Sequence, residues 1–193
     1  LKKIIFKKLD KLKKIIKFRP VIIGGGENFK SYGKILIKQL GKKTPIILSG
    51  SRALKNFASL NTKFSNPVIM LLSGNELKKV SINNEKNIFK KLKINYFIAE
   101  EAFLENKNIL NYGKVVLSNS VAINPLLLAG LALRKAKLRN AYLAFFDGDS
   151  DSDKGKIVMK ETDESLGILK KLGINFHSLT KTYLNVEEIN PYT

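Results

Sequence analysis

The segment Pro20-Val21-Ile22-Ile23-Gly24-Gly25-Gly26-Glu27-Asn28 joins a short, mostly β-branched apolar run to three glycines, and a helical pattern begins directly after it. Glycines at the carboxyl end of a parallel strand let the backbone turn sharply and bring its N–H groups toward an anion. The positive end of the following helix points at the same place. The segment therefore predicts a strand, a ligand loop and a helix at the start of an α/β domain.

Apolar runs and helical patterns alternate along the rest of the chain. Strands are expected at about 20–24, 45–49, 67–72, 95–98, 114–117, 141–146 and 174–178. Helices are expected at about 2–17, 29–40, 51–58, 86–92, 119–137 and 159–172, with Ser51 as a cap and Gly41 and Gly173 as stops. This alternation predicts a three-layer, Rossmann-like α/β domain, in which helices cover both faces of a mostly parallel sheet.

Length and composition limit the classes of protein to be considered. A chain of 193 residues suits one such domain and buries roughly two thirds of its unfolded surface without disulfides. The absence of cysteine excludes disulfides and thiolate chemistry and fits a cytoplasmic location. With His177 as the one histidine, a zinc site of the usual kind is excluded as well. No apolar run reaches the roughly 18 to 20 residues that a membrane span requires.

The net charge of +19 comes from 35 Lys and Arg against 16 Asp and Glu. Lysines are spread over almost every predicted helix, which indicates a compositional bias and argues against a nucleic-acid partner. Residues 1–19 are the exception, because they hold nine Lys or Arg and one Asp around an apolar helical stripe. We interpret 1–19 as a basic amphipathic linker from a missing upstream domain, with membrane or nucleic-acid binding as the alternative. The expected ligand-binding domain is 20–184, and 185–193 is a tail.

Small and polar residues follow the predicted strands at five places. These segments are Gly24–Asn28, Ser49–Ser51, Ser73–Glu76, Ser118–Ser120 and Asp147–Asp149. Because ligands of parallel sheets bind at the carboxyl ends of the strands, the segments predict one shared crevice. The residues expected to line it are Gly24, Gly25, Gly26 and Asn28 for an anion, together with Ser49, Asn75, Ser118 and Asn119. The glycines match neither the dinucleotide fingerprint nor a P-loop, so a tight turn without a ligand is the alternative.

An acidic run, Asp147-Gly148-Asp149-Ser150-Asp151-Ser152-Asp153, follows the strand expected at 141–146. Its spacing does not fit an EF-hand loop. Asp147 and Asp149 are candidate ligands for Mg²⁺ or Mn²⁺ held with a nucleotide, and Asp147 is also the best catalytic candidate. Asp151 and Asp153 are interpreted as a solvated turn, and His177 as a structural residue.

Three pieces of the chain resemble a known domain. They are Val21–Phe29, Leu71–Lys79 and Ala141–Gly148, and the ending Phe176–Tyr183 also fits. Together they look like the domain appended to hydroxymethylglutaryl-CoA-lyase-like aldolases, which are related to 4-hydroxy-2-oxovalerate aldolase. The resemblance implies an upstream aldolase-like domain that carries the lyase barrel. More distantly, the plan is similar to bacterial sialyltransferases and to the pterin diphosphokinase-like family, although Gly26-Glu27-Asn28 stands where those families show a Gly-Pro-Ser type of loop.

Three functions are therefore expected from the sequence. The first is an accessory domain of an aldolase- or lyase-like protein, in surface-glycan or related metabolism, that binds a nucleotide or other phosphorylated small molecule. The second is a transferase that uses a nucleotide sugar. The third is a non-catalytic docking domain whose crevice no longer binds a ligand.

Overall fold

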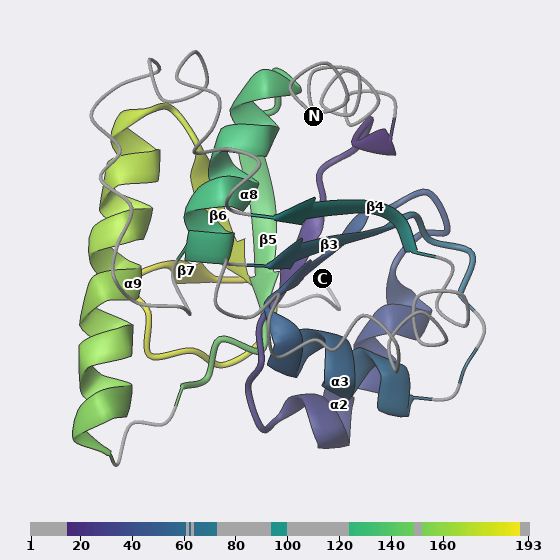
Figure 1. The fold of residues 1–193 in the computed structure, drawn as a ribbon, viewed down its shortest axis with the longest axis horizontal. Helices are drawn as coiled ribbons and strands as arrows, with labels where there is room; N and C mark the ends of the chain where they lie inside the picture. The colour runs from purple at the N-terminus through teal and green to yellow at the C-terminus, as the bar shows by residue number, and fades with distance from the viewer. Residues whose placement is uncertain are drawn as a thin grey trace.

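The structure is a computed structural model that describes residues 15–60, 62, 64–72, 94–99, 124–148 and 152–189. Its strands form one seven-stranded sheet in the order β4-β3-β2-β1-β5-β6-β7 (Figure 1). All of the pairings between neighbouring strands are parallel. The strands are β1 Val21–Ile23, β2 Ile46–Ser49, β3 Val68–Leu72, β4 Ile94–Ala99, β5 Asn140–Ala144, β6 Asn175–Ser178 and β7 Glu187–Glu188. The helices are α2 Phe29–Gln39, α3 Ser51–Ser59, α8 Asn124–Lys135 and α9 Asp153–Lys171.

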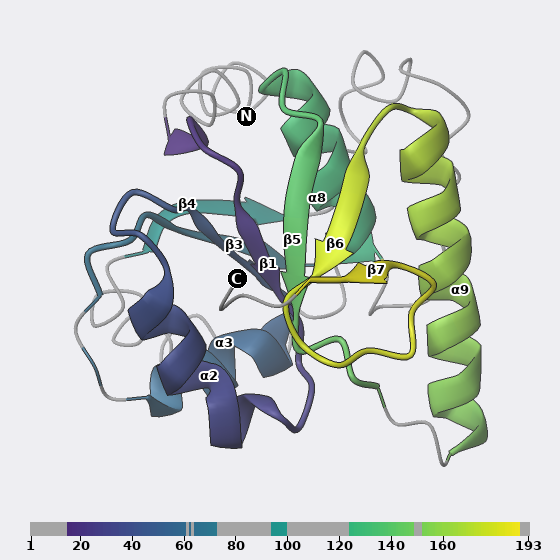
Figure 2. The ribbon, with the colours of Figure 1, turned by 180° about the vertical axis from the view of Figure 1, so that it is seen from behind.

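Two apolar clusters, one on each face of the sheet, hold the three layers together. Because side chains alternate along a strand, Ile22, Ile47 and Ile69 pack in the cluster that contains α8 and α9. Their neighbours Val21, Ile46 and Val68 pack in the cluster that contains α2 and α3. Helix α8 lies in front of β5 in Figure 1 and behind it in Figure 2. The expected three-layer Rossmann-like architecture is confirmed.

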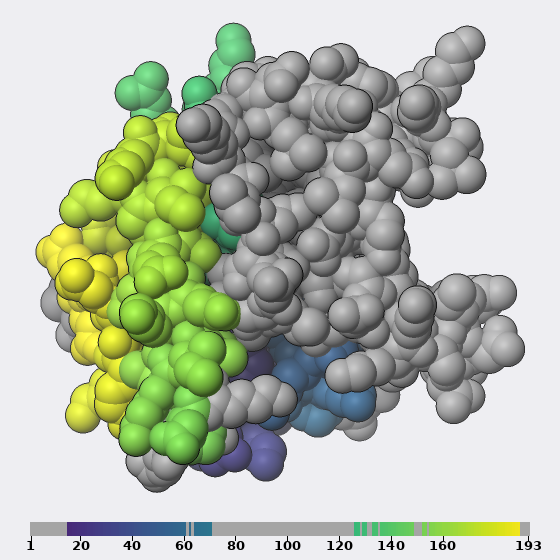
Figure 3. Space-filling view, turned by 60° about the vertical axis from the view of Figure 1, so that its left-hand side comes forward, coloured from purple at the N-terminus to yellow at the C-terminus, as the bar shows by residue number. Residues whose placement is uncertain are grey.

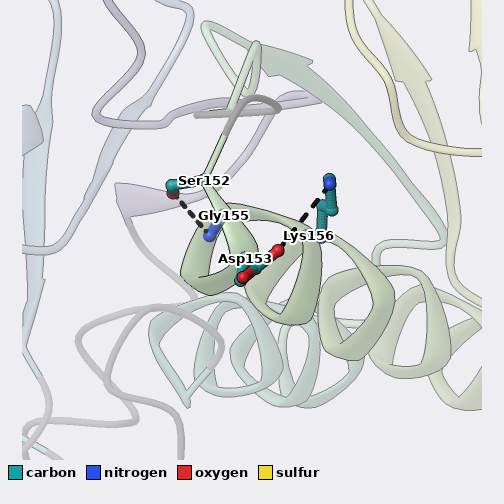
Figure 4. Close-up of polar contacts among 4 residues, drawn as sticks. All are labelled: Ser152, Asp153, Gly155 and Lys156. Carbon is teal, nitrogen blue, oxygen red and sulfur yellow. Dashed lines mark hydrogen bonds and ion pairs between the residues drawn. The ribbon is translucent and has the colours of Figure 1, made fainter.

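Helix α9 begins earlier than expected, at Asp153 in place of residue 159. The Ser152 hydroxyl oxygen accepts a hydrogen bond from the Gly155 N–H at 3.0 Å, which caps the helix (Figure 4). Asp153, expected in a solvated turn, is the first helical residue and forms an ion pair with Lys156 at 3.7 Å. The sequence pattern missed residues 153–158 because the first four, Asp153–Lys156, are charged residues and a glycine. Figure 3 shows α9 running along the outer surface of the molecule.

Three other boundaries differ from the expected ones. Strand β5 ends at Ala144, two residues early, because Phe145 has a φ of 60° and leaves the extended conformation. The N-cap of α3 is Gly50, and Ser51 is already helical. Residues 187–188, placed in the tail from the sequence, form β7 beside β6.

Several expectations lie outside the described residues. They are the helices at 2–17 (apart from its last residues) and 86–92, the strand at 114–117, and the start of the helix at 119–137. Among the residues that are described, no helix has both the length and the apolar character needed to cross a membrane.

Candidate ligand site at the carboxyl edge of the sheet

The order of the strands reverses direction between β1 and β5. From β1 the chain continues through α2 to β2 on one side, and from β5 it continues through α9 to β6 on the other. In open parallel sheets, the crevice at such a switch point, outside the carboxyl ends of the strands, is where ligands bind. Ile23 pairs with both Leu48 and Ala144. The segments that follow β1, β2 and β5 therefore start at the same level of the sheet, as the sequence predicts.

The glycine loop after β1 is bonded directly to the segment after β5. The Gly24 N–H donates to the Ala144 carbonyl oxygen and the Gly26 N–H to the Phe145 carbonyl oxygen, each at 2.9 Å. A Cβ on residue 24 would lie 2.5 Å from the Phe145 carbonyl oxygen. Glycine is needed at this position because the two backbone segments approach too closely for a side chain.

Asp147 reaches from the β5 side to the start of α2. Its Oδ2 accepts a hydrogen bond from the Asn28 N–H at 3.0 Å, and the residue is 8% exposed. The other oxygen, Oδ1, is buried and has no hydrogen-bond partner among the described residues. A buried carboxylate oxygen without a donor or a cation is costly in free energy. Asp147 therefore has an unmet acceptor oxygen at the switch point, buried against Gly26, and a ligand reaches it when the side chain or the glycine loop shifts.

The same contacts change the expected use of the glycine loop. The N–H groups of Gly24, Gly26 and Asn28 all donate within the chain. Those of Phe29 and Lys30, in the first turn of α2, donate to carbonyl oxygens of the loop. The Asp147 carboxylate thus already takes the anion position at the positive end of α2. A phosphate has to displace these bonds or bind through other groups.

Helix α3 covers the other side of the glycine loop and brings two residues that sequence reasoning missed. A Cβ on Gly25 would lie 2.8 to 3.0 Å from the aliphatic carbons of Arg52, so this side chain extends over the loop. Arg52 is exposed. The Asn56 side-chain amide donates to the Gly26 carbonyl oxygen at 3.4 Å. Helices that follow parallel strands begin at the ligand edge, so a cation in the first turn after β2 is the signal that could have identified Arg52.

The remaining predicted residues are placed as follows. Ser49 ends β2, and its hydroxyl oxygen is buried with no partner in the described part of the chain. Asn28 is exposed, and within the described structure its side chain makes no capping hydrogen bond. Asn75, Ser118, Asn119, Asp149 and Asp151 lie outside the described residues. The described residues contain no cluster of three or more His, Asp or Glu that could hold a metal ion.

His177 lies in β6 opposite Tyr142, before the carboxyl edge of the sheet. Its Nε2 is 3.5 Å from a carboxylate oxygen of Glu187 in β7. The Nδ1 atom is buried and unpartnered as far as the described residues go. The structure therefore separates His177 along the strand from the loops that meet at Asp147.

Fold and site together define a Rossmann-like α/β domain. At its switch point, buried polar atoms of Ser49 and Asp147 have no hydrogen-bond partner among the described residues. A scan against protein-family models and a search of curated proteins find no match to this chain.

Proposed function

We propose that this domain binds a nucleotide or another phosphorylated small molecule at the carboxyl edge between β1 and β5. The observation that carries the proposal is Asp147, which is 8% exposed and keeps its Oδ1 without a partner among the described residues. Folding tolerates such a group poorly, so a buried carboxylate at a ligand edge is a candidate for recognition. Its position at the switch point supports the same conclusion.

A hydroxyl group of the ligand suits Asp147 better than a phosphate does. A carboxylate accepts hydrogen bonds strongly and repels a phosphate placed beside it. A ribose or other sugar offers hydroxyl donors of the required kind. A Mg²⁺ ion brought by the nucleotide is a second way to satisfy Oδ1, because protein-bound Mg²⁺ needs only one or two carboxylates besides phosphates and water.

The phosphate then belongs on the side of Arg52. Its side chain lies over Gly25 at the start of α3, and the residue is exposed. A guanidinium binds phosphate with two parallel hydrogen bonds, and the first turn of α3 adds a partial positive charge. A ligand with a hydroxyl group at one end and a phosphate at the other therefore matches both sides of the glycine loop.

The resemblance to the domain appended to hydroxymethylglutaryl-CoA-lyase-like aldolases supports an accessory role for this domain beside an aldolase- or lyase-like unit. A glycosyl transfer from a nucleotide sugar is the catalytic alternative, and Asp147 is then the residue to test. The internal hydrogen bonds of Gly24, Gly26 and Asn28 favour the third candidate, a docking domain with an unused crevice.

A thermal-shift panel separates these functions. UMP, CMP, UDP-glucose and glucose 1-phosphate are compared with uridine, cytidine and glucose, each with and without Mg²⁺. A ligand at 100 times its dissociation constant adds about 2.7 kcal/mol to the free energy of unfolding. We expect at least one phosphorylated compound to raise the melting temperature and its unphosphorylated counterpart to do less.

The matched variant is Asp147→Asn. Its side-chain oxygen can still accept from the Asn28 N–H, but the charge and the second acceptor oxygen are lost. We expect the variant to fold and the ligand-induced shift to disappear. An unchanged shift in this variant removes Asp147 from the site. If no compound raises the melting temperature of the wild type, ligand binding is overturned and the docking function is favoured. If the protein turns over UDP-glucose, the transferase function is favoured.

A further inference from the structure

The segment between β6 and β7 is bonded to the backbone that carries Asp147. The Phe145 N–H donates to the Thr180 hydroxyl oxygen at 2.8 Å. The Thr182 hydroxyl donates to the Phe146 carbonyl oxygen at 2.9 Å. Two threonines separated by one residue therefore hold two consecutive residues, Phe145 and Phe146, which directly precede Asp147 in the sequence.

The β5 segment needs such support because its backbone is unusual. Phe145 has a φ of 60°, a left-handed conformation that an aromatic residue rarely adopts and that persists only when the surroundings enforce it. The residue is fully buried, and its ring packs edge-on against Phe29 with the centroids 4.9 Å apart. Its N–H group therefore needs an acceptor inside the protein, and Thr180 provides one.

The threonine segment is itself fixed from several sides. The Ser178 hydroxyl donates to the Thr180 carbonyl oxygen at 2.7 Å, and the Thr182 N–H donates to a carboxylate oxygen of Glu188 at 2.9 Å. The Leu184 N–H donates back to the Thr182 hydroxyl oxygen at 3.2 Å. A hydroxyl that both donates and accepts has a defined orientation, so Thr182 is well suited to hold a carbonyl group in place.

We propose that Thr180 and Thr182 are positioning residues of the ligand site. They hold the strained backbone of Phe145 and the carbonyl group of Phe146 so that the Asp147 carboxylate contacts the Asn28 N–H. The other carboxylate oxygen, buried against Gly26 with no donor among the described residues, is thereby left for the ligand. The part of this inference that concerns the ligand rests on the proposed function. The positioning of Asp147 can be tested without any ligand.

The variants Thr180→Val and Thr182→Val remove each hydroxyl at nearly constant shape, whereas Thr180→Ser and Thr182→Ser keep it. Thr162→Val is the matched control, because the buried Thr162 hydroxyl also donates to a backbone carbonyl oxygen, that of Val158 at 2.6 Å, but in α9. Amide hydrogen exchange of Asn28 in the full chain reports the bond to Asp147. The exchange rate of the Asn28 amide is divided by the exchange rate of the Val21 amide, whose N–H donates to the Pro45 carbonyl oxygen. A change in global stability affects both rates and cancels in this ratio.

We expect each valine variant to raise the ratio of the Asn28 to the Val21 exchange rate at least tenfold. The serine variants should keep the wild-type ratio, and Thr162→Val should leave it unchanged. An unchanged ratio in folded valine variants overturns the proposal, as does an equal increase in Thr162→Val. For a compound that shifts the wild-type melting temperature, the valine variants should raise the dissociation constant at least tenfold. If no compound binds the wild type, the proposed function fails while the exchange ratio still decides the positioning role.

Discussion

The Asp147 carboxylate lies against the Cα of Gly26, in the space that a side chain on residue 26 would occupy. A Cβ there would be 2.5 Å from the carboxyl carbon of Asp147 and 2.6 Å from the Phe145 carbonyl oxygen. The third glycine of the loop is thus matched to an aspartate 121 positions further along the sequence. The pair joins the segment after β1 to the segment after β5 at the switch point.

Gly26→Ala should therefore destabilise the protein. The added methyl group must displace either the carboxylate or the backbone, and overpacking of this kind typically costs about 1–3 kcal/mol. Displacing Asp147 also breaks its bond to the Asn28 N–H. The free energy of unfolding, measured by urea denaturation, should fall by an amount in this range.

Gly167→Ala is the control for this substitution. Gly167 lies in α9 and is exposed, and a methyl group added there would meet no other part of the described structure within 4 Å. Alanine in a helix interior is more stable than glycine by about 0.5–1 kcal/mol. The two alanine variants should thus shift stability in opposite directions, and a stabilising Gly26→Ala would contradict the close contact with Asp147.

Much of the fold could be predicted because the central strands are apolar runs that end in small residues. Val21–Ile23, Ile46–Ser49 and Val68–Leu72 are each expected within a residue or two of their bounds. The end of β5 could not be predicted, because Phe145 and Phe146 continue the apolar run and the change of φ at Phe145 depends on contacts with distant segments.

The candidate site was predicted only in part for a similar reason. Position after a strand identified Gly24–Gly26 and Asp147, and the structure brings them together. The sequence could not show that Asp147 bonds to the N–H of Asn28, because this contact spans 119 residues. Arg52 and Thr180 were missed because their roles depend on which loop each one packs against.

Ser152→Ala should shorten or weaken α9. The Ser152 side chain accepts the Gly155 N–H at the start of this 19-residue helix, and loss of an N-cap costs typically about 1 kcal/mol. Asp153→Ala in the same turn removes an exposed ion pair and an exposed charge at the helix start, and it should change the urea midpoint less than Ser152→Ala does. Equal losses in both variants would show that charge at the helix start, and not the cap, is what matters.

Asp147→Ala should be less stable than Asp147→Asn. Alanine leaves the part-buried Asn28 N–H without its protein acceptor, and the loss of such a hydrogen bond costs about 0.5–1.5 kcal/mol. Asparagine supplies an oxygen of similar reach and removes a buried charge. Urea denaturation at neutral pH should rank asparagine above alanine, and the reverse order would show that the bond to Asn28 contributes nothing.

Arg52→Ala should weaken the binding of phosphorylated ligands selectively. The aliphatic carbons of Arg52 lie over Gly25 of the glycine loop, and a hydrogen bond from its guanidinium to a phosphate would contribute about 1.5–3 kcal/mol. The lower value corresponds to slightly more than a tenfold increase in the dissociation constant. Titration calorimetry with a nucleotide and its nucleoside should show this loss for the nucleotide and little change for the nucleoside.

Lys55→Ala separates a specific contact from a general effect of charge. Lys55 is an exposed cation in the same helix, so its removal lowers the net charge by the same amount. We expect it to leave the affinity for the nucleotide within about twofold, because an exposed charge that makes no hydrogen bond to the phosphate acts on it only through water and is weakened by salt. If both variants weaken the nucleotide equally, or if Arg52→Ala weakens the nucleoside as much as the nucleotide, the phosphate does not bind at Arg52. The ligand would then have to be oriented the other way, with its phosphate displacing the Asp147 carboxylate from the start of α2.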